Sequence, residues 1–145
     1  MRLVSCFQEN GLIPSKYTCD GKNILPPLRV EDLPPGTKSL AFIMDDPDAV
    51  KPAGHVWDHW LVWNVPPPGT IEEGKEPAGV HGKNHFNKLT WGGPCPPDGE
   101  HTYVFAAYAL DTALTIPEGS TKQQLLTAMK GHVLAKAVLR GRYKR

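Results

Sequence analysis

Three short segments of this chain carry residue types that can bind a charged ligand or exchange protons. They are the acidic turn Asp45-Asp46-Pro47-Asp48-Ala49, the run His59-Trp60-Leu61-Val62, and the turn-rich stretch from Gly93 to Tyr103. Each joins polar residues to an apolar run or to a stiff Pro/Gly turn, so each can present fixed side chains at a strand end. Histidine N–H groups and the backbone N–H groups of glycine-rich turns both suit phosphate oxygens. These residues therefore predict a site for a small anion.

The apolar runs beside these segments predict strands that bring them together. Residues 39–44 read as a buried strand that ends at the acidic turn, and residues 57–65 read as a strand covered on both faces. A third strand, roughly 101–110, begins at a histidine. If the first strand runs antiparallel to the other two, Asp46, His59 and His101 meet at one edge of the sheet.

Strict alternation assigns the residues of these strands to faces. In the third strand, His101 and Tyr103 share a face with the residues that follow at every second position. In the second strand, one face is expected to carry Trp57, His59, Leu61, Trp63 and Val65. Core positions are expected for Trp60 and Trp63.

The rest of the chain predicts a mainly β domain. Fifteen prolines and fourteen glycines cut it into short pieces suited to strands, and residues 66–90 read as a long irregular excursion. A helix is expected from the capping-box spacing of Ser120 and Gln123, followed by a strand to the C-terminus, with a helix running on to Arg140 as the alternative. We expect one domain, residues 1–145, built as a two-sheet β-sandwich with one or two peripheral C-terminal helices.

Composition argues against several classes of protein. Sixteen basic and fifteen acidic residues leave a net charge of +1, so no global field favours nucleic acid or an anionic membrane. No apolar run approaches the roughly 18 residues of a membrane span, and the N-terminus lacks the apolar core of a signal peptide. We therefore expect a cytoplasmic protein. Cys6, Cys19 and Cys95 form no CxxC pair, so they are expected to be reduced thiols.

The motifs, taken in order, resemble the phosphatidylethanolamine-binding protein family, whose members include the Raf kinase inhibitor protein. The resemblance rests on the DPDA turn, the HWLV strand and the GPCPP-x-G-x-H-x-Y segment. Further matches to the short bacterial and archaeal branch are residues 17–21, 26–28, 35–40 and 132–135. The resemblance covers nearly the whole chain and implies a β-sandwich with a phosphate-sized pocket. Val50 departs from the family pattern, which has proline there.

Function and site residues follow from this resemblance. It implies a non-enzymatic binding protein for phosphate or a phosphorylethanolamine headgroup, acting on a kinase-like or protease partner, with no cofactor and with homodimers formed through a sheet face. The pocket residues that it implies are Asp46, Trp57, His59, Gly93, Pro94, His101 and Tyr103.

Other readings of the same residues remain open. Asp46 could simply cap its turn, and Cys95 is favoured as a small apolar turn residue over a thiol nucleophile. Asp46, His59 and His101 could form the facial triad of a metal-dependent hydrolase, although neither HExxH nor GxSxG occurs. Inhibition of a serine protease through an exposed loop is a further alternative.

Overall fold

A six-stranded sheet forms the centre of the computed structural model, which describes residues 1–145. Its strands are β2 (Gly11–Leu12), β8 (Val133–Lys144), β7 (Glu100–Leu110), β4 (Ser39–Asp46), β5 (Trp57–Val65) and β6 (Val80–His81), in that spatial order. β4 is antiparallel to both β5 and β7, as the convergence of the three polar segments requires. β7 is antiparallel to β8, and β2 is parallel to β8.

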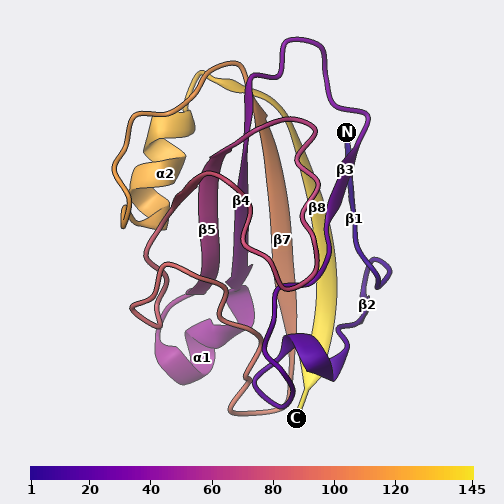
Figure 1. Ribbon diagram of the computed structural model, residues 1–145. Coiled ribbons are helices and arrows are strands. Elements are labelled where there is room, and N and C mark those ends of the chain that lie inside the picture. The colour runs from indigo at the N-terminus through magenta and orange to yellow at the C-terminus, as the bar shows by residue number, and fades with distance from the viewer.

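The second layer is smaller than the first. A two-stranded sheet of β1 (Arg2–Val4) and β3 (Arg29–Glu31) lies over one face of the large sheet together with long loops, as Figure 1 shows. The helix α2 (Lys122–Met129) covers part of the other face. The prediction of a mainly β fold with a C-terminal helix is confirmed. No helix is long and apolar enough to cross a membrane.

The core is divided by the sheet into two clusters. β4 is buried on both faces, so Phe42 packs in the larger cluster, against β1 and β3, whereas Ile43 packs in the smaller cluster beneath α2. Trp60 lies in the larger cluster and Trp63 in the smaller one, which confirms both as core residues. The strands that carry the polar segments are therefore held from both sides.

Two irregularities in β5 overturn the strict alternation expected for this strand. The pairing of β5 with β4 shifts register near Asn64, whose φ is 57°, and again where Met44 and Asp45 lie opposite Trp60 and Asp58. Each shift inserts an extra residue, which moves the following side chains to the opposite face. Val65 consequently joins the larger cluster, away from Trp63, and His59 does not share the environment of Leu61.

The C-terminal helix begins one residue later than expected, and the final strand begins earlier, at Val133. The capping box is formed by Thr121 and Gln124 instead of Ser120 and Gln123, and α2 ends at Met129. Gly131 then adopts a left-handed φ of 81°, which lets the chain turn into β8. The final strand is therefore correct, and the alternative of a helix to Arg140 is wrong.

The loops that follow β4 gather at one end of the large sheet. A short 3-10 turn, η2 (Pro47–Ala49), and the single-turn helix α1 (Val50–Ala53) lead from β4 to β5, below the strand ends in Figure 1. The other 3-10 turn, η1 (Ser15–Tyr17), belongs to the N-terminal loop. The irregular stretch between β6 and β7 returns to the same end of the sheet, where it brings its turn residues close to Asp46.

Candidate functional site: a pocket at the end of the central strands

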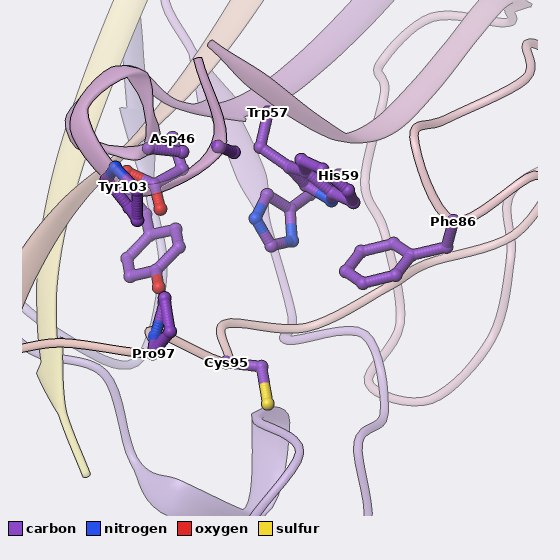
Figure 2. A pocket seen from close by; sticks show the side chains of 10 residues that line it. Asp46, Trp57, His59, Phe86, Cys95, Pro97 and Tyr103 are labelled. Carbon is purple, nitrogen blue, oxygen red and sulfur yellow. The ribbon is translucent and has the colours of Figure 1, made fainter. Parts of the chain in front are cut away.

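A pocket of about 210 Å³ opens where β4 ends and β5 and β7 begin. Figure 2 shows Asp46 and Tyr103 on one side of it, Phe86 on the other, and Cys95 and Pro97 along its lower edge. The pocket is lined by Asp46, Ala49, Pro52, Ala53, Trp57, His59, Phe86, Cys95, Pro97 and Tyr103. Four of the seven residues predicted for the site, Asp46, Trp57, His59 and Tyr103, therefore lie in this wall.

Asp46 both caps a turn and takes part in the site. One carboxylate oxygen, Oδ1, accepts a hydrogen bond from the backbone N–H of Asp48 at 2.9 Å, which fixes the turn η2. The other oxygen, Oδ2, lies 2.6 Å from Nδ1 of His101. With 3 % of its surface exposed, Asp46 is held in a single position at the inner end of the pocket.

His101 lies behind Asp46, outside the lining of the pocket. Its second nitrogen, Nε2, lies 2.8 Å from Oδ1 of Asp98, so both ring nitrogens face carboxylates. Burial alone would lower the pKa of His101, but the hydrogen bonds with Asp46 and Asp98 outweigh burial and raise it. Burial raises the pKa of Asp46, and its bond with His101 only partly opposes this rise. Because the pKa of Asp46 and the pKa of His101 are both raised, the pair tends to keep the proton that lies between them. His101 therefore positions Asp46 and has no N–H left for a ligand.

His59 reaches the pocket because of the register shift in β5. It is 3 % exposed, and its Nδ1 lies 2.6 Å from the carbonyl oxygen of Gly92. Because a carbonyl can only accept, Nδ1 carries the proton, and neutral His59 has a lone pair on Nε2. Burial lowers the pKa of His59 to about 4, so the ring is neutral at physiological pH. His59 thus offers an acceptor where the sequence suggested a donor.

Two pocket residues carry hydrogen-bond donors with no protein partner. These are the indole Nε1 of Trp57 and the hydroxyl of Tyr103, both of which are buried. Buried donors without partners are uncommon and costly in folded proteins. Burial also raises the pKa of Tyr103, so its phenol keeps its proton. Both groups belong to residues that line the pocket, and neither has a partner within the protein.

Phe86 is a pocket residue that sequence reasoning missed. Its ring stands edge-on to Trp57 and to His59, with ring centroids 5.5 and 5.3 Å away. The buried Asn84 holds the loop in place, since its Oδ1 accepts from the backbone N–H of Phe86 and its Nδ2 donates to the carbonyl oxygen of His59. The one sequence signal for an ordered loop at Phe86 is Asn84, because asparagine side chains often fix turns.

Gly93 and Pro94 lie outside the lining and hold the pocket loop against the N-terminal loop. The backbone N–H of Gly93 donates to Oδ1 of Asn23 at 2.9 Å, and the carbonyl of Pro94 accepts from the backbone N–H of Cys19 at 3.1 Å. A Cβ on Gly93 would lie 2.3 Å from the carbonyl oxygen of Tyr17. Only glycine fits this contact, so both residues support the pocket from behind.

A disulfide between Cys19 and Cys95 corrects the prediction of reduced thiols. The two Cα atoms lie 5.4 Å apart although 76 positions separate the residues in the chain. No local cysteine motif predicts this pairing, because only the fold brings the loops of Cys19 and Cys95 together. Cys95 is therefore neither a free thiol nor an unattached turn residue. Cys6 is a free thiol, as expected, and it is exposed.

The polar groups do not assemble into a metal-ligand set. Among Asp46, His59 and His101, only Asp46 and His101 are in contact, and His101 uses both nitrogens for carboxylates. Nowhere in the chain do three or more His, Cys, Asp or Glu side chains form a group that could hold a metal ion. The pocket lining also contains no lysine or arginine.

Comparisons with known proteins agree with the fold and the motifs. The family model described as phosphatidylethanolamine-binding protein matches residues 4–144. A UPF0098 protein of Methanothermobacter thermautotrophicus is 49% identical over 146 residues, which cover 96% of this chain and 95% of that protein. A UPF0098 protein of Chlamydia muridarum is 46% identical over 149 residues, which cover 99% of this chain and 99% of that protein.

Two crystal structures show the same architecture. One is of CT736 of Chlamydia trachomatis, described as a putative phosphatidylethanolamine-binding protein homolog. It has a TM-score of 0.93 and 44% identity over 99% of this chain and 97% of that chain. The other is of YbcL of E. coli, described as a new member of the mammalian family, with a TM-score of 0.88 and 30% identity over 99% and 98% of the two chains. This chain therefore belongs to the phosphatidylethanolamine-binding protein family.

Proposed function

We propose that this protein binds a small phosphorylated ligand of about the size of a phosphorylethanolamine headgroup, without altering it chemically. The observation that carries the proposal is the pocket of about 210 Å³ in which the Trp57 indole N–H and the Tyr103 hydroxyl lack protein partners. Phosphate oxygens accept several hydrogen bonds, so one bound group can satisfy both donors. A cavity of this volume takes a headgroup and leaves no room for acyl chains.

The charges around the pocket favour a phosphate that retains one proton. No lysine or arginine lines the wall, and the neutral His59 presents the lone pair of Nε2. A phosphate dianion carries no proton, so it could not donate a hydrogen bond to this lone pair or to the Asp46 carboxylate. A monoprotonated phosphate supplies an O–H donor for one of these acceptors and keeps oxygens for Trp57 and Tyr103. Phosphomonoesters accept this proton with a pKa near 6, which is close to physiological pH.

The pocket chemistry supports binding over catalysis. Cys95 is held in a disulfide, and the raised pKa of Tyr103 makes its phenol a poor nucleophile. No serine or threonine lines the wall. Action on a kinase-like or protease partner, and assembly as a homodimer, stay predictions of the family resemblance.

Removal of the Tyr103 hydroxyl tests this proposal. In a Tyr103→Phe protein, we expect the affinity for phosphorylethanolamine to fall roughly tenfold or more, because a charge-assisted hydrogen bond is lost. The free energy of unfolding should stay the same or rise, because the change removes a buried hydroxyl that has no partner in the free protein. Calorimetric titration and urea unfolding measure the two quantities.

Tyr108→Phe provides the matched control. Tyr108 is on the same strand but packs with the cluster beneath α2, on the other face of the sheet. Its replacement should leave ligand affinity unchanged. Equal affinities for wild type and a folded Tyr103→Phe protein would remove this pocket as the phosphate site.

A further inference from the structure

The Cys19–Cys95 disulfide connects solvent to the pocket. Cys19 is exposed on the N-terminal loop, whereas Cys95 is half-buried and belongs to the pocket wall, as Figure 2 shows. Thiol–disulfide exchange requires that a thiolate can reach a disulfide sulfur. The exposed position of Cys19 meets this requirement. A change at this cysteine is transmitted through one covalent bond to the ligand site.

Few other interactions hold the part of the pocket loop that follows Pro94. Outside helices and strands, no backbone–backbone hydrogen bond involves residues 95–99. The bonds that fix this loop from behind, at Gly93 and Pro94, lie before Cys95. Beyond it, Asp98 contacts His101. The disulfide is therefore the covalent restraint on the wall that Cys95 and Pro97 contribute, beside the burial of Pro96 and the contact of Asp98.

We propose that the Cys19–Cys95 disulfide is a site of thiol–disulfide exchange, through which a dithiol reductant lowers the ligand affinity of the pocket. The loss of affinity rests on the function proposed above, whereas the exchange itself and the loosening of the wall do not. The partner is defined by its chemistry: a small dithiol, or a protein with two neighbouring thiols.

The exchange is balanced as a two-electron reduction. A thiolate of the reductant attacks the Sγ of the exposed residue Cys19, the Cys19–Cys95 bond breaks, and Cys95 leaves as a thiolate that takes a proton from solvent. The second thiol of the reductant, as its thiolate, then attacks the mixed disulfide. Cys19 is released as a thiol after protonation, and the reductant becomes a disulfide. Two electrons pass from the dithiol to the cysteine pair.

Reduction has a direct geometric consequence for the pocket. Bonded sulfur atoms lie about 2 Å apart, whereas sulfur atoms that are not bonded stay roughly 3.5 Å or more apart. At least one of the two cysteine side chains must therefore move, and the wall at Cys95 and Pro97 loses its covalent anchor. In the reduced protein, ligand binding must therefore order a part of the wall that the disulfide holds in place in the oxidised protein. We expect affinity to fall about fivefold or more through this loss of preorganisation.

The test uses the full chain in a Cys6→Ser background, which removes the one other thiol. Affinity for phosphorylethanolamine is measured by calorimetry at 20 °C, before and after treatment with dithiothreitol. We expect weaker binding after reduction, and the same weak binding, insensitive to dithiothreitol, when Cys19 and Cys95 are both replaced by serine. Equal affinity for the oxidised and the reduced protein, each folded by circular dichroism, overturns the proposed control of affinity.

A measurement without ligand separates this proposal from the proposed function. Thiol titration counts the cysteines that dithiothreitol releases, and an NMR spectrum follows the indole N–H signal of Trp57. Two released thiols with a shifted or broadened Trp57 signal support an exchange site that loosens the pocket, even if phosphorylethanolamine binds neither form. A disulfide that resists dithiothreitol in the folded protein, or an unchanged Trp57 signal after its reduction, overturns the proposal.

Discussion

Replacement of Cys19 by serine is expected to lower the free energy of unfolding by about 4 kcal/mol. The Cys19–Cys95 disulfide spans 76 positions, and a crosslink across a loop of this length restricts the unfolded chain strongly. Urea unfolding of the oxidised wild type and the variant at 25 °C measures the difference. This loss is a large share of the roughly 5–15 kcal/mol typical of a domain, although the variant should still fold.

A mutant cycle separates the crosslink from local packing. Cys95→Ser should cost about as much as Cys19→Ser, and the double variant should be no less stable than either single variant, because each change alone breaks the same bond. Cys6→Ser, which removes the free and exposed cysteine, should change stability by less than about 0.5 kcal/mol. Additive losses in the double variant would show that the two sulfur atoms act separately.

Acidification from pH 7 to pH 4 is expected to remove about 3 kcal/mol of stability through His59 alone. Burial lowers the pKa of His59 to about 4 in the folded protein, whereas the unfolded chain has the ordinary value near 6.5. Between these two values, the unfolded state binds a proton that the folded state does not. The contribution is therefore fully present above pH 6.5 and is lost as the pH falls toward 4.

Comparison with a His59→Gln variant isolates this contribution from other titrating groups. Urea unfolding at pH 7, 6, 5 and 4.5 should show a smaller acid loss for the variant than for the wild type, because glutamine does not titrate. The raised pKa of His101 adds stability as the pH falls, and this contribution is the same in the wild type and in the His59→Gln variant. Identical pH profiles would mean that His59 is protonated as easily in the folded state as in the unfolded state.

The arrangement of the main strands could be predicted from sequence because it rests on local patterns. The buried run before Asp46 and the apolar alternation after His101 each identify a strand, and antiparallel pairing brings their polar ends together. The family motifs then identify Trp57 and Tyr103 as pocket residues. Both kinds of signal lie within short stretches of the chain.

The features that sequence reasoning missed depend on contacts between distant segments. The Cys19–Cys95 pair joins two loops with no common motif, and Phe86 enters the pocket because Asn84 and His85 tie its loop to β5. The register shift beside His59 is likewise set by pairing with β4. Alternation within a single strand cannot reveal such an insertion.

The chemistry of the two histidines also depends on their partners in the fold. Sequence alone treats His59 and His101 as equivalent donors to an anion. In the structure, the single N–H of neutral His59 donates to the carbonyl oxygen of Gly92, and both nitrogens of His101 face carboxylates. In the pocket lining, the donors without a protein partner are instead the indole N–H of Trp57 and the hydroxyl of Tyr103.

An NMR titration with phosphorylethanolamine at pH 6.5 tests the central claim most directly. The signals to follow are the Trp57 indole N–H and the His59 imidazole, with His132, which contacts Asp111 beyond the far end of β7, as the reference. We predict saturable shifts at Trp57 and His59 with a common dissociation constant and no shift at His132. Unchanged Trp57 and His59 signals at saturating ligand would contradict phosphate binding in this pocket.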